Sequence, residues 1–226
     1  MVHNLICGAF TSVGAGTDWR YTPYHMPHRT EVMGFMTILH GDDRFYNNIF
    51  FQKFPKESLI SRFDDGEIWE EERVVGTHVW DHYPLYEDWI KRFDLDSDTP
   101  DMMKIAKAHF DHLPVWIEGN AYLGGAQRFC KETNYLMDDT TKVYVDVKED
   151  GDKVYLDTNL AEALGSFTAS LIDTDVLGKA FEPQQRFEDR DGSDIVFDTD
   201  YFGEKRSAII PGPFASLDLK GKNVVL

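Results

Sequence analysis

The segment Asn48-Ile49-Phe50-Phe51 places an asparagine directly before a short apolar run that is typical of a β-strand. The same order occurs at Asn4-Leu5-Ile6-Cys7 and at Asn120-Ala121-Tyr122-Leu123. Asparagine tolerates left-handed backbone angles, and its amide group both donates and accepts hydrogen bonds. We therefore expect three turns that lead into strands, with the asparagines stacked in a hydrogen-bonded ladder on adjacent coils of a parallel β-helix.

Long segments separate these strands, because the first two asparagines lie 44 residues apart and the last two lie 72 residues apart. Such spacings exceed one regular coil, so large loops must leave the partial solenoid. Residues 35–39 form an apolar run that we expect to be a further coil strand, followed by a turn at 40–43. Residues 53–110 are rich in charged and turn-forming residues, and we expect a loop excursion there.

One short helix is expected at the end of this excursion. Asp98 or Thr99 can cap its N-terminus, and Pro100 suits its first turn. The apolar residues Met102 and Ile105 share one face of the predicted helix.

Four aromatic side chains lie close together in the middle of the excursion. They are Trp80, Tyr83, Tyr86 and Trp89. They could stack on sugar rings, but each ring has a large area to bury. We therefore favour an aromatic cluster that anchors the excursion to the core.

The pattern changes to antiparallel β-structure from residue 141. Residues 142–147 alternate between polar and apolar side chains, 149–152 form a turn, and 153–157 return, which predicts a hairpin. Residues 195–197 and 217–226 suggest further strands. We expect a mainly β protein, with coils over 1–140 and a β-sandwich-like cap over 141–226 that covers one open end of the solenoid.

The charge of the chain limits its partners. Forty acidic and 23 basic residues leave a formal net charge of −17, which repels phosphate backbones and anionic lipids. We therefore expect no nucleic acid and no membrane partner, whereas a neutral glycan remains compatible. No signal peptide or membrane-spanning run is recognisable, so we expect a cytoplasmic protein.

Four strings of residues resemble the later part of the glycoside hydrolase family 120, whose members are β-xylosidases. The strings are 2–8 (VHNLICG), 22–31 (TPYHMPHRTE), 41–50 (GDDRFYNNIF) and 197–203 (FDTDYFG). The resemblance implies a right-handed parallel β-helix with an associated β-sandwich region. It also implies retaining hydrolysis of xylose from the non-reducing end of xylo-oligosaccharides. We expect no cofactor.

Retaining hydrolysis requires two carboxyl groups about 5 Å apart, one as nucleophile and one as acid/base. The resemblance places that pair in coils that precede Met1, so we assign no catalytic residue to this chain and expect the isolated chain to be inactive. We expect a missing N-terminal half or a homo-oligomer to cover the open coil. The alternative is a noncatalytic carbohydrate-binding or structural β module. A small enzyme that uses Glu31 or Glu118 ranks last.

The sequence also contains polar side chains of the types that hold sugar hydroxyl groups. The candidates are Arg20, Tyr24, His25, His28, Arg29, Glu31 and Glu118. All but Glu118 fall in one loop, which Pro23 and Pro27 could equally stiffen as an ordinary surface loop. Glu118 lies on a predicted coil strand, where it could face a groove or bond to the backbone.

Two groups of histidines have spacings that a zinc site could use. His78 and His82 form one group, and His109, Asp111 and His112 form the other. Neither group matches an established metalloenzyme signature. We therefore expect solvated or packed histidines and no metal.

Overall fold

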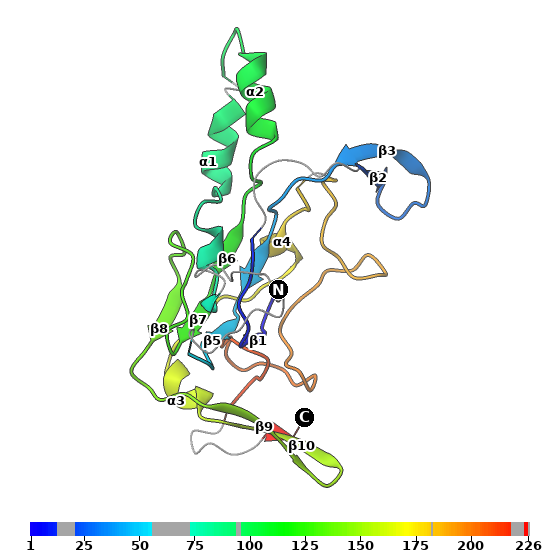
Figure 1. Cartoon of the computed structure of the whole chain (residues 1–226). Coiled ribbons are helices and arrows are strands. Elements are labelled where there is room, and N and C mark those ends of the chain that lie inside the picture. Colours follow the sequence, from blue (N-terminus) through cyan, green and yellow to red (C-terminus); the bar gives the residue numbers. More distant parts are fainter. Residues whose placement is uncertain (13–20, 56–72, 94–95, 182, 218–223, 226) are drawn as a thin grey trace, which may run out of the picture.

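Short parallel strands that are distant in the sequence pair with one another in the computed structural model (Figure 1). The structure describes residues 1–12, 21–55, 73–93, 96–181, 183–217 and 224–225. One sheet has the order β1-β5-β7-β8, and each neighbouring pair in it is parallel. Its strands are β1 (Leu5–Ile6), β5 (Ile49–Phe51), β7 (Asn120–Leu123) and β8 (Tyr135–Asp138).

A second parallel pair joins β4 (Arg44–Tyr46) to β6 (Trp116–Glu118). A parallel bridge between Val2 and Tyr46 continues this pairing toward the N-terminus. The chain passes from β4 to β5, and from β6 to β7, through one or two residues. The three predicted strands after Asn4, Asn48 and Asn120 are thus confirmed as neighbours in one sheet.

A ladder of asparagine side chains connects these strands. The backbone N–H and Nδ2 of Asn4 both donate to Oδ1 of Asn48, at 2.9 and 3.1 Å. Asn48 donates to Oδ1 of Asn120 in the same way, at 2.9 and 3.0 Å. Asn120 then donates to Oε1 of Glu132, at 3.2 and 2.9 Å. The predicted ladder is confirmed, and a carboxyl group that sequence reasoning missed ends it.

The residue before each ladder asparagine turns the chain from one sheet to the other. His3, Asn47 and Gly119 have φ values of 56°, 56° and 75°, which lie in the left-handed region. We expected the ladder asparagines themselves to benefit from tolerance of such angles. The structure instead separates the two roles, because the preceding residue takes the strained angle and the ladder asparagine supplies hydrogen bonds.

The sheet that contains β5 and β7 is buried on both faces. Phe50 and Tyr122 point toward β4 and β6 and stack with ring centroids 5.2 Å apart. Ile49 and Leu123 point the opposite way and pack against Leu160 and other residues of the C-terminal region. Burial on both faces explains why these strands are continuous apolar runs without polar alternation.

The predicted coil strand at 35–39 is wrong. Residues 35–37 belong to β3 (Val32–Thr37), which pairs antiparallel with β2 (Tyr21–His25). This hairpin projects from the parallel strands (Figure 1), and Phe35 is 74% exposed. Pairing with a nearby segment closes a much shorter loop than pairing with a distant coil, which favours the hairpin. The run also lacks the leading asparagine that precedes or begins β1, β5 and β7.

The excursion at 53–110 contains helices. They are the 3-10 helices η3 (His78–Trp80) and η4 (Lys91–Phe93) and the α-helices α1 (Tyr86–Ile90) and α2 (Met102–His109). The predicted helix is confirmed as α2. Its N-cap, however, is Asp101 rather than Asp98 or Thr99, and the Asp101 carboxylate accepts from the backbone N–H groups of Met103 and Lys104.

The expectation of only one helix is wrong, because α1, α3 (Leu160–Leu164) and α4 (Thr174–Leu177) are also helical. Each has four or five residues. So short a segment cannot display the 3.6-residue periodicity on which a helix prediction depends.

The predicted C-terminal hairpin is confirmed as β9 (Val145–Asp150) and β10 (Lys153–Thr158), with β11 (Val224–Val225) beside β10. Val196 forms an isolated antiparallel bridge with Asp173 rather than a strand. In the described part of 141–226 these three strands form a single sheet, so a second layer that would make a sandwich is absent there. Instead, Val145 and Leu156 pack with α3 against the outer face of β5 and β7.

None of the helices in the described ranges is long and apolar enough to span a membrane.

Candidate functional site

The outward face of the β4–β6 pair forms the floor of the candidate site. Side chains alternate along a strand, and Phe45 and Ile117 point into the core. Arg44 and Tyr46 on β4, and their partners Trp116 and Glu118 on β6, therefore point to the opposite face.

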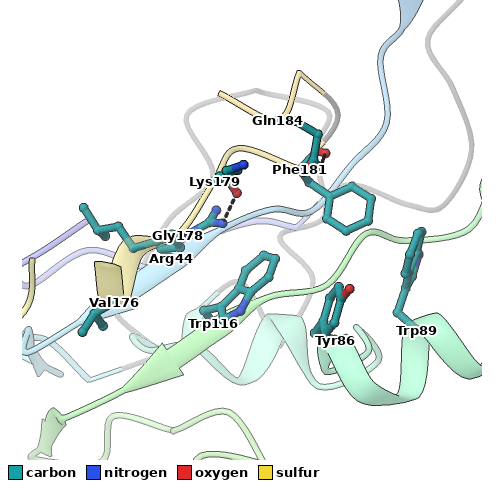
Figure 2. A pocket seen from close by; sticks show the side chains of 10 residues that line it. Arg44, Tyr86, Trp89, Trp116, Val176, Gly178, Lys179, Phe181 and Gln184 are labelled. Carbon is teal, nitrogen blue, oxygen red and sulfur yellow. Dashed lines mark hydrogen bonds between the residues drawn. The ribbon is translucent and has the colours of Figure 1, made fainter. Parts of the chain in front are cut away.

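The larger of two adjacent cavities on this face, the Trp89 cavity, has a volume of about 570 Å³. In Figure 2, Trp116 and Tyr86 stand on one side of it and the segment with Lys179, Phe181 and Gln184 on the other. Its lining consists of Arg44, Tyr86, Trp89, Trp116, Val176, Leu177, Gly178, Lys179, Phe181 and Gln184. A concave, aromatic-rich site of this size is large enough for a small organic ligand.

Arg44 builds this cavity rather than offering free hydrogen bonds to a ligand. Its guanidinium donates to the carbonyl oxygens of Leu177 and Lys179, both at 2.8 Å (Figure 2). It also donates to the carbonyl and carboxylate oxygens of Asp42, at 2.9 and 2.5 Å. The guanidinium carbon lies 4.1 Å from the ring centroid of Trp116. Arg44 therefore fixes both the 177–179 segment and the indole ring.

The second cavity on this face, the Glu118 cavity, has a volume of about 340 Å³. Its lining consists of Tyr46, Leu85, Tyr86, Glu87, Val115, Trp116, Ile117, Glu118, Lys131 and Thr133. Tyr86 and Trp116 line both cavities, so the two are neighbours. Burial raises the pKa of Tyr46 to about 12, so its hydroxyl keeps its proton at neutral pH.

A third cavity, the Asp43 cavity, has a volume of about 230 Å³ and is lined by Asp43, His40, Trp80, Tyr83 and neighbouring residues. Oδ2 of Asp43 accepts from Nε1 of Trp80 at 2.9 Å. Burial raises the pKa of the Asp43 carboxyl, and the Trp80 hydrogen bond opposes part of that rise. Sequence reasoning treated Asp43 only as part of a turn, and nothing in the local pattern indicates that it is half-buried.

Asp43 and Glu118 open into different cavities. In the strand register, Glu118 lies opposite Tyr46, which is three residues beyond Asp43. Three residues of a strand span about 10 Å, and side chains an odd number of residues apart point to opposite faces. These two carboxyl groups therefore do not form a pair at the separation that retaining hydrolysis requires.

The chain is similar to XylC. The match is to a solved structure, the complex structure of XylC with xylose, at 30% sequence identity and a TM-score of 0.77. It covers all of this chain and 32% of the XylC chain, so this chain spans about a third of that protein. No family model and no curated protein matches the sequence.

The structure separates the predicted sugar-binding residues. Glu118 is exposed and lines a cavity beside Trp116. Tyr24 and His25 lie on β2, and His28, Arg29 and Glu31 lie in the loop that follows it, on the projecting hairpin (Figure 1). Arg20 lies outside the described residues.

The hairpin residues contact one another and one distant segment. His28 forms a hydrogen bond with Glu188, and Nδ1 of His25 lies 3.1 Å from the carbonyl oxygen of Glu31. The Tyr24 hydroxyl donates to the sulfur of Met26 at 3.3 Å. The structure therefore does not bring Glu31 together with Glu118, and the sugar-binding role of the hairpin stays a prediction.

The aromatic cluster of the excursion divides into two kinds of residue. Trp80, Tyr83 and Trp89 are buried, which confirms the predicted anchoring role. Tyr86 is 43% exposed and lines both adjacent cavities, so the anchoring prediction is wrong for this residue. In Figure 2 its ring stands between Trp116 and Trp89 at the wall of the Trp89 cavity.

Three histidines of the predicted groups, His82, His109 and His112, pack against aromatic rings. The His112 ring lies 3.9 Å from the Tyr83 ring and 4.7 Å from the His82 ring, between centroids. Burial lowers the pKa of His112. Within the ranges that the structure describes, His, Cys, Asp and Glu form no group of three or more that could hold a metal ion.

Proposed function

We propose that this chain is part of a β-xylosidase-like glycoside hydrolase of family 120 and binds a xylose unit of a xylo-oligosaccharide. The observation that carries the proposal is the similarity to XylC, which extends over this entire chain at 30% identity. The XylC structure contains xylose. Identity at this level over the whole of this chain supports a shared ligand class as well as a shared fold.

The arrangement of the strands supports the corresponding proposal for the fold, which is a right-handed parallel β-helix. Two parallel sheets are connected through one- or two-residue corners. The asparagine ladder follows the same direction as the strand pairing. Parallel strands stacked with identical side chains at equivalent corners are typical of solenoids.

The Glu118 cavity is the proposed sugar site. Trp116 and Tyr86 offer aromatic surface against which the apolar face of a sugar ring can pack. Glu118 offers acceptor oxygens, and the protonated hydroxyl of Tyr46 offers a donor and an acceptor. The combination of an apolar wall with a few polar groups suits a neutral, hydroxylated ring.

Titration calorimetry with xylobiose compares two variants, each of which replaces one carboxylate. We expect Glu118→Gln to weaken binding about fivefold, since it removes a charge-assisted acceptor for sugar hydroxyls. Glu149→Gln on the exposed hairpin is the matched control and should leave the affinity unchanged. Absence of xylobiose binding to the unaltered chain would contradict the proposed function.

In this proposal the chain supplies one wall of the sugar site but not the catalytic pair of carboxyl groups. We expect no turnover of a chromogenic xyloside by the isolated chain, because Asp43 and Glu118 face different cavities. Release of chromophore in proportion to the concentration of protein, and its loss in Asp43→Asn, would overturn the noncatalytic part of the proposal.

A further inference from the structure

The two neighbouring cavities on the outward face of β4 and β6 differ in the charge of their walls. Two carboxylates, those of Glu87 and Glu118, belong to the lining of the Glu118 cavity. The lysine of that cavity, Lys131, donates to the carbonyl oxygen of Tyr83 at 2.8 Å. The Glu118 cavity therefore suits a neutral ring and repels an anionic ligand.

The Trp89 cavity has the opposite charge. Among the residues described for its lining, Arg44 and Lys179 are cationic and none is acidic, although the whole chain has a net charge of −17. The Arg44 guanidinium is engaged by the carbonyl oxygens of Leu177 and Lys179 and by Asp42. The ammonium group of Lys179 forms no ion pair and no hydrogen bond with any residue in the described ranges. One cation thus remains available to a ligand in this cavity.

The backbone that carries this cation is fixed. The carbonyl oxygen of Lys179 accepts from Arg44 at 2.8 Å, and an isolated antiparallel bridge pairs Lys179 with Arg186. The exposed side chain is left to move at the rim of the cavity. A fixed backbone lowers the conformational entropy that is lost when the ammonium group meets a ligand.

The walls between the rims are aromatic. Figure 2 shows the rings of Trp116 and Tyr86 on one side and that of Phe181 on the other, near Lys179. The Phe181 ring is held edge-on against Trp89, with ring centroids 4.5 Å apart. Aromatic walls favour a ligand with a flat ring, because offset and edge-to-face ring contacts add to the burial of apolar area.

We propose that the Trp89 cavity binds a small aromatic carboxylic acid, with its ring among Trp116, Tyr86 and Phe181 and its carboxylate on the ammonium group of Lys179. A neutral ligand would leave this charge unused, and a cationic ligand would be repelled by it. Binding of the acid goes beyond the proposed xylose site and does not depend on it. It gives a role to the segment 176–181, which sequence reasoning did not connect with a ligand.

Three ligands of similar size test the charge and the ring separately. Cinnamate, its neutral amide cinnamamide and the saturated acid 3-cyclohexylpropanoate are titrated into the full chain by calorimetry. We expect cinnamate to bind about fivefold more tightly than cinnamamide, the upper end of what an exposed ion pair contributes. It should bind about threefold more tightly than the saturated acid, because that acid lacks ring contacts. The preference for cinnamate over cinnamamide should shrink in 0.5 M salt, at which ionic strength exposed charges are screened.

Lys179→Gln removes the charge at a solvent-exposed position, so the fold should persist. It should weaken cinnamate about fivefold and leave cinnamamide unchanged. Lys142→Gln is the matched control, because Lys142 is also exposed and lines none of the three cavities. It makes the same change in net charge and should alter neither affinity.

A second pair of variants tests the place of binding. Val176→Trp fills the Trp89 cavity from a position that the Glu118 cavity does not share, and it should abolish cinnamate binding. Val196→Trp is its control, because Val196 is 44% exposed, against 45% for Val176, and lines neither cavity. It should leave cinnamate binding unchanged.

The inference is overturned if cinnamate does not bind, if the amide or the saturated acid binds as tightly, or if Lys179→Gln or Val176→Trp leaves cinnamate binding intact. Xylobiose binding is a separate measurement. Its absence would contradict the proposed function and would leave the aromatic acid site standing.

Discussion

The asparagine ladder has two ends that use the same hydrogen-bond geometry in different surroundings. At one end, Asn120 and Glu132 are 0% and 4% exposed, and the Tyr122 hydroxyl donates to the same carboxyl at 2.6 Å. At the other end, Asn4 is only half-buried. An unpaired polar group costs more where water cannot replace the lost partner. The difference indicates that the Glu132 end of the ladder holds the parallel strands together more strongly than the Asn4 end.

The largest expected effect comes from Asn120→Ala. The Asn120 side chain accepts from two groups of Asn48 and donates to Glu132 and to the carbonyl oxygen of Phe45. Its removal leaves several buried groups unpaired, so we expect a loss of about 4 kcal/mol in the free energy of unfolding. Urea denaturation measures the loss. A loss below about 1 kcal/mol would show that water or movement of the coils replaces the ladder bonds.

The next largest effect is a dependence of stability on pH, which arises at the Glu132 end of the ladder. Burial raises the pKa of Glu132 from 4.5 to about 7, against the opposing effect of its hydrogen bonds. The folded chain therefore favours the protonated carboxyl. Its contribution to stability is fully present below pH 4.5 and is lost as the pH rises through about 7.

Glu132→Gln tests this dependence, because glutamine keeps the shape of the carboxyl and does not ionise. Between pH 4.5 and pH 8, we expect the unaltered chain to lose roughly 3 kcal/mol of stability relative to the variant. Urea denaturation at both pH values gives the difference. A difference that stays constant with pH would mean that the carboxyl ionises freely within the folded chain.

A smaller effect is expected at the corner before Asn120. Gly119 has a φ of 75°, and a Cβ there would lie 2.2 Å from Oδ1 of the buried Asn47. Gly125 also has a positive φ, of 97°, but a Cβ there meets no atom within 4 Å. We expect Gly119→Ala to destabilise the chain by about 2 kcal/mol more than Gly125→Ala. Equal decreases of the melting temperature in the two variants would mean that backbone strain alone, and not the contact with Asn47, causes the destabilisation.

Asn4→Ala should have the smallest effect. It removes the Nδ2 bonds to Asn48 and to the carbonyl oxygen of Val2, at 3.1 and 3.0 Å, at a position that water reaches. The backbone N–H of residue 4 still reaches Asn48. We expect a loss of about 1 kcal/mol in the urea experiment. A loss as large as that of Asn120→Ala would remove the contrast between the two ends.

Local patterns predicted the elements that depend on neighbours in the sequence. The hairpin β9–β10 and the helix α2 were predicted because alternation, turn residues and capping groups act within a few residues. The β2–β3 hairpin was mistaken for a coil because an apolar strand has the same composition in either pairing. Half-buried Asp43 and buried Glu132 were missed as acids with raised pKa values, because only long-range packing removes them from water.

By itself, the sequence determined three asparagine-led strands, their ladder and an acidic surface, because the hydrogen-bonding capacity and charge of a side chain do not depend on distant contacts. Tertiary structure alone decided which face of β6 carries Glu118, how Tyr86 and Trp116 come to line two cavities, and how Glu132 ends the ladder. Burial and the meeting of distant segments set those properties. Both arise only when the strands pack together.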